Sequence, residues 1–136
     1  MISCLALLHT VLLGGRRMKF ENTGLENQTV ELSRLDDIME RLGFVRAAQW
    51  DYERVTYDRK YVVKEGTYYL RVQGYAIEGN VDSRYALIKL LTPILGKHYY
   101  PHGVEYGDDE HFPSSLVSQC QNVLAQVKSE LEKLKE

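Results

Sequence analysis

The stretch that decides the fold reads RVTYDRKYVVKEGTYYLRVQGYAIE over residues 54–78. Apolar and polar residues alternate along it, and β-branched and aromatic side chains are frequent, which is the pattern of half-buried β-strands. The sequence Lys64-Glu65-Gly66 divides the stretch, and Gly66 can adopt a positive φ without steric cost. We therefore predict an antiparallel hairpin with strands at 54–63 and 67–78.

The alternation assigns each side chain of the hairpin to one of two sheet faces. The first face is the more apolar one and carries Val55, Tyr57, Tyr61, Val63, Tyr68, Leu70, Val72, Gly74 and Ala76. The second face is half wet and carries Arg54, Thr56, Asp58, Lys60, Tyr69, Arg71, Gln73, Tyr75 and Ile77. We expect the core to lie against the first face.

A short helix is predicted over residues 33–42, because apolar residues recur there at spacings of three and four. Ser33 is the expected N-cap, Asp36 stands where a capping box places its acid, and Gly43 is placed to end the helix.

A long amphipathic helix is predicted from Ser114 or Ser115, both read as caps, to about Leu134. Its apolar stripe consists of Leu116, Val117, Cys120, Val123, Leu124, Val127, Leu131 and Leu134. Such a helix is marginally stable alone in water, so it must pack against another surface. That surface is the sheet in our main interpretation, and a second copy of the helix in a homodimer is the alternative.

The remaining segments predict shorter elements. Residues 18–20 and 28–32 are short extended pieces, 44–50 and 85–91 are strands, and 96–113 is a polar loop. The chain is thus expected to be one α+β domain. A curved antiparallel sheet of about four to five strands carries both helices on one face.

Charge and cysteine content exclude several classes of protein. The 136 residues include 17 basic and 19 acidic side chains, with a net charge of -2, which disfavours nucleic acid as a partner. Two cysteines are too few for a disulfide framework, which favours the cytoplasm. Cys120 lies on an apolar stripe, so it is expected to be buried and unreactive.

Residues 1–17 differ in character from the rest of the chain. The apolar run from Met1 to Leu13 precedes Arg16 and Arg17, which is the reverse of a signal peptide. The run is also too short to cross a bilayer, so no membrane association is expected. We predict that Met18 is the true start and that 1–17 is non-native or dispensable, with a membrane-associating or cleaved leader as the alternative. Residues 18–136 then form the domain.

The candidate metal site lies in residues 98–111. His98, His102 and His111, with Glu105, are the ligand types that zinc, manganese or iron bind. Pro101 and Gly103 indicate a loop, and acidic loop residues are more often solvated. The sequence predicts no cofactor, and a bound divalent metal is the alternative.

The second face of the hairpin is the candidate ligand-binding surface, at Tyr69, Arg71, Gln73 and Tyr75. Residues that could join it are Arg46, Trp50, Arg54 and Thr56. Tyrosine and arginine together can hold an anionic small molecule, contact a protein or stack on bases. They can equally form cross-strand pairs alone.

Four segments resemble the YugN-like family of small proteins from Gram-positive bacilli. They are MKFENTGLENQTVELSRLDDIMERLGF from Met18, YYLRVQGYAIEGN from Tyr68, LLTPILGKHYYPHGVEYG from Leu90, and the closing amphipathic helix. The resemblance implies a compact α+β domain in which a curved antiparallel sheet holds a long C-terminal helix. It implies no functional residues.

Together these observations favour a non-enzymatic cytoplasmic module that binds a small molecule or a protein and has no catalytic residues. The alternative is a small metal-dependent or acid-base enzyme that uses the loop from His98 to His111.

Overall fold

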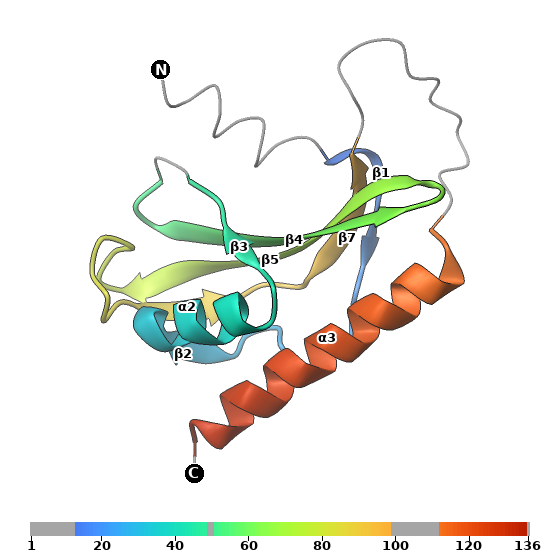
Figure 1. Cartoon of the computed structure of the whole chain (residues 1–136). Helices are drawn as coiled ribbons and strands as arrows, with labels where there is room; N and C mark the ends of the chain where they lie inside the picture. Colours follow the sequence, from blue (N-terminus) through green and yellow to red (C-terminus); the bar gives the residue numbers. More distant parts are fainter. Residues whose placement is uncertain (1–12, 49–50, 99–111, 136) are drawn as a thin grey trace.

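The computed structural model describes residues 13–48, 51–98 and 112–135. In chain order, its elements are β1 (Leu13–Lys19), β2 (Thr29–Glu31), α2 (Leu32–Arg41), β3 (Val45–Arg46), β4 (Arg54–Val63), β5 (Gly66–Glu78), β6 (Leu87–Leu90), β7 (Ile94–His98) and α3 (Ser114–Lys133). The strands form one antiparallel sheet, and both helices lie on the same side of it (Figure 1). The predicted α+β architecture is confirmed.

The predicted hairpin forms the centre of the sheet as β4 and β5. Val63 pairs with Gly66 across the turn, and the ladder continues without interruption to Arg54 and Tyr75. Gly66 has a φ of 143°, a value that suits glycine because a Cβ would be strained there. The hairpin and the division of its residues between two faces are confirmed.

The other edge of β5 is shared by two strands. Its first half, Tyr68–Arg71, pairs with β7, and its second half pairs with β6 between Gly74 and Glu78. β1 extends the sheet beyond β7, β2 extends it beyond β6, and β3 lies on the outer edge of β4. The second face of β5 is therefore flanked by different neighbours at its two ends.

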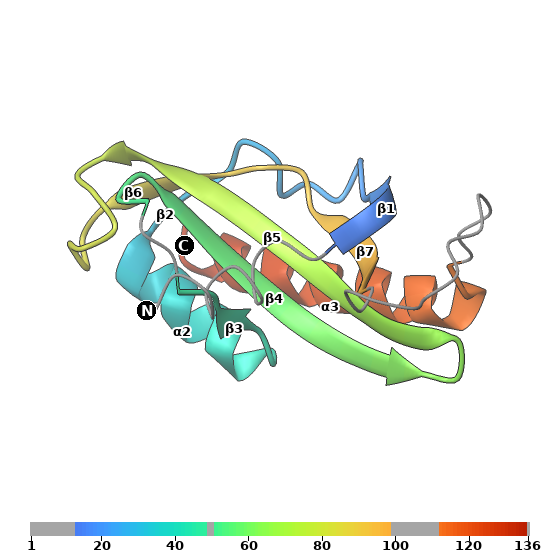
Figure 2. The same cartoon turned by 90° about the horizontal axis from the view of Figure 1, so that it is seen from above.

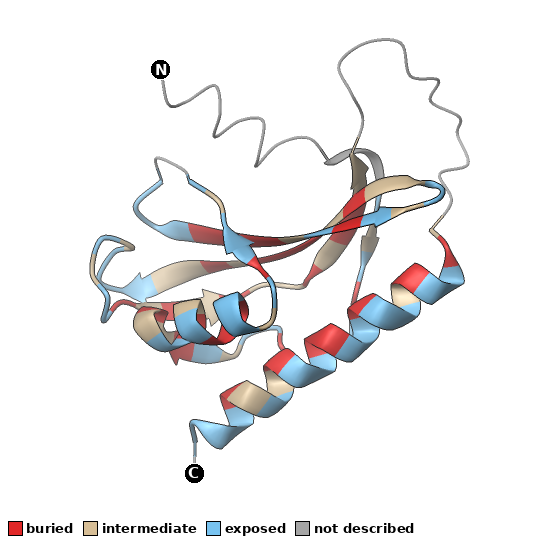
Figure 3. Cartoon of the chain, in the orientation of Figure 1, coloured by how far each residue is buried: buried red, intermediate tan, exposed pale blue. Residues whose placement is uncertain are grey.

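The core fills the space between the first face and the two helices. Tyr68, Leu70 and Val72 of β5 are fully buried there, and so are Leu116 and Leu124 of α3. Figure 2 shows α3 beneath the sheet, crossing β4 and β5 obliquely. Figure 3 shows that the buried residues of α3 follow the side that faces the sheet. Leu134, at the end of the predicted stripe, is 38% exposed.

α2 begins one residue earlier than predicted, and its predicted capping box is wrong. Glu31 is the N-cap and makes no side-chain capping bond, while the Ser33 hydroxyl donates to the Glu31 carboxylate at 2.9 Å. The backbone N–H groups of Leu32 and Ser33 donate instead to the carbonyls of residues 86 and 84. Because β2 runs directly into α2, the neighbouring chain satisfies the groups that a cap normally satisfies.

The predicted serine caps of α3 are also wrong. Pro113 is the N-cap, and its carbonyl accepts a hydrogen bond of 3.0 Å from the N–H of Val117. The end of α2 is as predicted, since Gly43 follows it with a φ of 89°.

Three predicted segments have different limits in the structure. The loop predicted from Gly96 is wrong at its start, because residues 96–98 belong to β7. Within the described part of 44–50, the strand covers Val45 and Arg46 alone, with one further bond from Ala47 N–H to the Thr56 carbonyl. The strand predicted over 85–91 is β6, four residues long. Short strands explain why the sheet has seven strands in the described part of the chain, where about four to five were expected.

In the described part of the chain, no helix combines the length and the apolar character that a membrane span requires.

Candidate functional site

The short edge strand β3 separates two cavities. Val45 pairs with Asp58 and therefore lies on the second face, whereas Arg46 pairs with Tyr57 and lies on the first face, next to α2. We call the cavity on the α2 side the helix-side cavity and the other one the second-face cavity. Each cavity is large enough for a small ligand. The side chains that line them therefore show which cavity is the better candidate for a ligand site.

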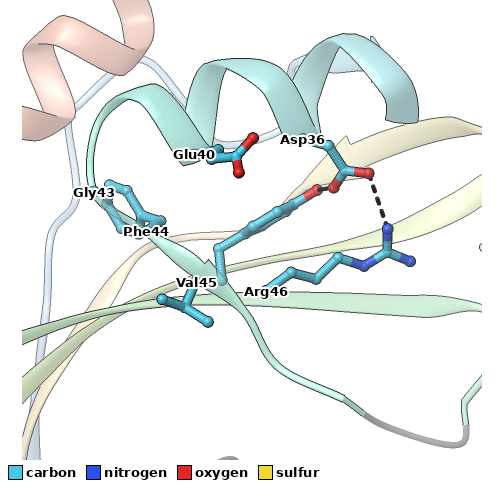
Figure 4. Close-up of a pocket in the computed structure, with 7 residues that line it drawn as sticks. Asp36, Glu40, Gly43, Phe44, Val45 and Arg46 are labelled. Atoms are coloured by element: carbon cyan, nitrogen blue, oxygen red, sulfur yellow. Dashed lines mark hydrogen bonds and ion pairs between the residues drawn. The ribbon is translucent and has the colours of Figure 1, made fainter.

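The helix-side cavity is shown in Figure 4 and has a volume of about 530 Å³. Its lining residues are Asp36, Glu40, Gly43, Phe44, Val45, Arg46 and Tyr57. Asp36 and Glu40 both project from α2 toward β3. The polar groups at the centre of this cavity are Asp36, Tyr57 and Arg46.

These three side chains bind one another. The Tyr57 hydroxyl donates to Asp36 Oδ1 at 2.5 Å, and Arg46 Nη1 donates to Asp36 Oδ2 at 3.0 Å. Arg46 Nη2 also donates to the carbonyl of Val81 at 3.3 Å. Burial, followed by the bond to Asp36, raises the pKa of the Tyr57 hydroxyl, which therefore stays a donor. We interpret this cluster as a structural tie between α2, β3 and β4, because both oxygens of Asp36 are occupied.

Four of the five directly opposed pairs that β4 and β5 place on the second face contain a charged, amide or aromatic side chain. They are Arg54 with Tyr75, Thr56 with Gln73, Asp58 with Arg71, and Lys60 with Tyr69. All four residues of the predicted ligand-binding set are thus on one face, as expected. Their environments differ, however, because Tyr69, Gln73 and Tyr75 are half-buried and Arg71 is buried.

Arg71 is bound to Asp58 rather than presented to water. Its Nε and Nη2 donate to the two carboxylate oxygens of Asp58 at 2.8 and 2.9 Å. Arg71 is 6% exposed and Asp58 is 7% exposed. Next to this pair, the Gln73 amide donates to the Thr56 hydroxyl at 3.0 Å, and Thr56 is also buried. The expected half-wet face is wet at Arg54 and Lys60 and buried between them.

The second-face cavity lies beside the Asp58–Arg71 pair and has a volume of about 410 Å³. Its lining residues are Val45, Arg46, Ala47, Ala48, Asp58, Lys60 and Tyr69. The exposed Lys60 pairs with Tyr69 across the ladder, and both line the cavity. The small residues after β3, Ala47 and Ala48, form an apolar wall. A cavity of this size, with an apolar wall facing polar side chains that can orient a ligand, is typical of small-molecule sites.

The sequence interpretation included Tyr69 and missed Lys60 and residues 45–48 as parts of this cavity. Lys60 could have been found, because a two-residue turn after Val63 places Lys60 opposite Tyr69. Residues 45–48 could not, since only folding brings them beside β4. Among the suggested additional residues, Arg54 and Thr56 lie on the second face. Arg46 faces α2 with its guanidinium but also lines the cavity, and Trp50 lies outside the described residues.

His98 is the one predicted metal ligand that the structure describes. Its ring meets the Tyr69 ring edge-on, with centroids 5.6 Å apart. Burial and then the charge of Lys60 lower the pKa of His98, which favours neutral imidazole. His102, Glu105 and His111 lie outside the described residues, and the described ones contain no group of three such ligands. The metal site therefore stays a prediction.

Cys120 is buried in α3, as predicted from the apolar stripe. Burial raises the pKa of its thiol to about 11. A thiol in this setting is protonated at neutral pH and unreactive.

Comparison with known proteins identifies two similar proteins of one bacterium. The chain is 56% identical to "Uncharacterized protein YlbA" of Bacillus subtilis (strain 168) over 110 residues, covering 81% of this chain and 92% of that protein. It is 26% identical over 83 residues to "Uncharacterized protein YugN" of the same bacterium, covering 61% and 62% of the two chains.

A solved structure is also similar. The crystal structure of the uncharacterized conserved protein YugN from Geobacillus kaustophilus HTA426 matches with a TM-score of 0.79 and 95% identity, over 87% of this chain and 98% of that one. The profile of the YugN-like family matches residues 21–132. This match confirms the resemblance noted in the sequence, and the chain belongs to the YugN-like family.

Proposed function

We propose that this chain is a non-catalytic, cytoplasmic binding protein that takes a small, flat, anionic molecule into the second-face cavity. The observation that carries the proposal is the opposition of Lys60 and Tyr69 in the wall of a cavity of about 410 Å³. An aromatic ring beside an ammonium group suits a ligand with a planar ring and an acidic group.

The surroundings of this pair support an anion rather than a cation. Asp58 is the acidic residue that lines the cavity, and Arg71 neutralises it through two hydrogen bonds. The buried ion pair therefore leaves Lys60 as the exposed charge next to Tyr69. Arg71 acts in this proposal as a positioning residue, because it holds Asp58 away from the ligand. The free thiol of Cys120 supports the reducing compartment.

The test is calorimetric titration of the full chain with mononucleotides and aromatic carboxylic acids. Lys60→Met should weaken a bound ligand about tenfold or more, since a hydrogen bond to a charged group contributes about 1.5 to 3 kcal/mol. Tyr69→Leu should weaken it about fivefold or more, since stacking on an aromatic ring contributes about 1 to 3 kcal/mol. Lys133→Met and Tyr85→Leu are the matched controls, because both residues are exposed and line none of the cavity. The proposal fails if no compound binds at millimolar concentration, or if the controls lose as much affinity.

A further inference from the structure

The strand register places a basic side chain beside each tyrosine of the second face. Lys60 of β4 is opposite Tyr69 of β5. Six residues along β5, Tyr75 lies between Arg54 of β4 and Lys89 of β6. The face therefore contains two similar units, each with an aromatic ring and at least one cation in the same row of paired residues.

Little negative charge lies between these two units. The pairs that separate them are Asp58–Arg71 and Thr56–Gln73, and the Asp58 carboxylate accepts both hydrogen bonds of Arg71. Arg54 has a carboxylate nearby, Asp51, at 3.9 Å, with both side chains about half exposed. A pair so open to water exchanges partners readily.

The acidic residues of the two helices lie on the other side of the sheet. Asp36, Asp37 and Glu40 belong to α2, and Glu130 and Glu132 belong to α3, and both helices lie beneath the first face. The same helices also carry Arg34, Arg41, Lys128 and Lys133, so this side of the sheet is close to neutral. It is the local field of a surface that attracts a charged partner, so the acidic total does not describe the second face.

We propose that the second face binds a single-stranded nucleic acid that lies along β5. Bases stack on Tyr69 and Tyr75, and phosphates contact Lys60, Arg54 and Lys89. Six residues of a strand span about 20 Å, a length that fits the several nucleotides covered by a sheet that binds single strands. The inference rests on the proposed function, because the base on Tyr69 occupies the second-face cavity, and it extends the ligand from one nucleotide to a chain.

Two other polyanions fit the observations less well. A duplex presents its phosphates but keeps its bases stacked on one another, so the tyrosine rings would stay unused. The carboxylates of an acidic peptide can pair with the basic side chains, but such a peptide offers no planar ring that stacks on Tyr69 and Tyr75. Unpaired bases joined by phosphates use both kinds of side chain in each unit.

The test measures fluorescence anisotropy of a labelled single strand of about ten nucleotides, as DNA and as RNA, with the full chain at several salt concentrations. The strand should bind at least about tenfold tighter than a mononucleotide, since it adds a second stacked base. Tyr75→Leu should weaken the strand about five- to hundredfold and leave the mononucleotide unchanged. Tyr75→Phe keeps the ring and should bind normally. The strand that binds with the higher affinity, DNA or RNA, identifies which of the two nucleic acids the face binds.

Salt dependence checks the phosphate contacts separately. Each contact adds about 0.7 to the slope of log affinity against log salt for a single strand, so Lys89→Met should reduce that slope by about 0.7. Tyr85→Leu and Lys133→Met are the controls and should change neither quantity.

Three results would overturn the inference. Equal affinity for strand and mononucleotide, with no effect of Tyr75→Leu, removes the nucleic acid and leaves the proposed small-molecule function standing. Equal competition by a duplex or by polyglutamate shows that stacking contributes nothing. If the strand does not bind even at low salt, the nucleic-acid inference is wrong. The calorimetric titrations with mononucleotides and aromatic acids then test the proposed small-molecule function separately.

Discussion

The Arg71 guanidinium and the Asp58 carboxylate face each other across the β4–β5 ladder through two hydrogen bonds of 2.8 and 2.9 Å. Both residues are more than nine-tenths buried. A pair of this kind adds little net stability over an apolar pair, but removing one partner leaves a buried charge without compensation. The pair is therefore a sensitive probe of the second face.

Arg71→Met should lower the free energy of unfolding by about 3 to 5 kcal/mol. The double change Arg71→Met with Asp58→Leu should lose less than Arg71→Met alone, because no isolated charge remains. Urea denaturation measures both. Arg54→Met is the control, since its ion pair with Asp51 is about half exposed and is worth at most about 1 kcal/mol. A double variant less stable than the single one would contradict the burial of this pair.

Tyr57→Phe should destabilise the protein by about 1 to 3 kcal/mol, because the Asp36 carboxylate loses a donor next to the helix-side cavity. Thermal unfolding and urea denaturation measure the loss. The matched change Tyr85→Phe removes a hydroxyl from a residue that is 75% exposed and should cost less than about 0.5 kcal/mol. Equal losses in the two variants would show that the tie between α2 and β4 is absent.

Leu124→Ala should cost about 2 to 5 kcal/mol, since Leu124 is fully buried between α3 and the sheet. Leu134→Ala, at the exposed end of the same stripe, should cost less than about 1 kcal/mol. Chemical denaturation of both variants compares a core and an edge position of one helix. If Leu124→Ala behaves like the surface variant, α3 does not pack on the first face.

Alkaline pH should destabilise the protein through Cys120. The folded thiol has a pKa of about 11 because it is buried, while an unfolded thiol ionises near pH 8.5. Above about pH 8.5 the unfolded state therefore binds fewer protons than the folded state, and stability falls as pH rises. Between about pH 8.5 and 10 the loss should reach about 1 to 2 kcal/mol.

Urea denaturation across this pH range tests the effect against Cys120→Ala, which should be less stable overall and should have a shallower slope. Some slope should remain, because the pKa values of Tyr57 and Tyr61 are also raised by burial. An unchanged slope in Cys120→Ala would assign the pH dependence to other groups. The thiol should also react with Ellman's reagent in the unfolded protein and not in the folded one.

Deleting residues 1–17 should leave the free energy of unfolding within about 1 kcal/mol of the full chain, well inside the 5 to 15 kcal/mol of an ordinary domain. Met18 and Lys19 keep their pairing with Leu95 and Ile94 after this deletion, whereas the pairing of Leu13 with His98 and of Arg17 with Gly96 is lost. Deleting 1–12 is the control, because it retains all of β1. A larger loss in the longer deletion alone would show that the first half of β1 stabilises the sheet.

The hairpin, the faces of β4 and β5 and the stripe of α3 could be predicted from the sequence because they depend on residues close in the chain. The limits of shorter elements could not. Gly96 interrupts the apolar pattern of β7, and Glu31 takes the place of a predicted serine cap because the backbone of residues 84–86 satisfies the first N–H groups of α2.

The candidate site could be predicted in part for the same reason. Alternation along β5 places Tyr69, Arg71, Gln73 and Tyr75 on one face, as the structure confirms. Alternation says nothing about the depth of burial, so Arg71, which was expected on a half-wet ligand-binding face, is instead a buried partner of Asp58. The wall formed by residues 45–48 has no counterpart in any local pattern.

By itself, the sequence determined the secondary structure of the hairpin and of the long helix, the face on which each hairpin residue lies, and membership of the family. The tertiary structure alone decided that β7 and β6 share one edge of β5, that Lys89 stands beside Tyr75, and that both helices lie on the side of the sheet opposite the second face. The physical reason is range. Periodicity and turn chemistry act over a few residues, whereas burial, ion pairing and local charge arise from segments that meet only after the chain has folded.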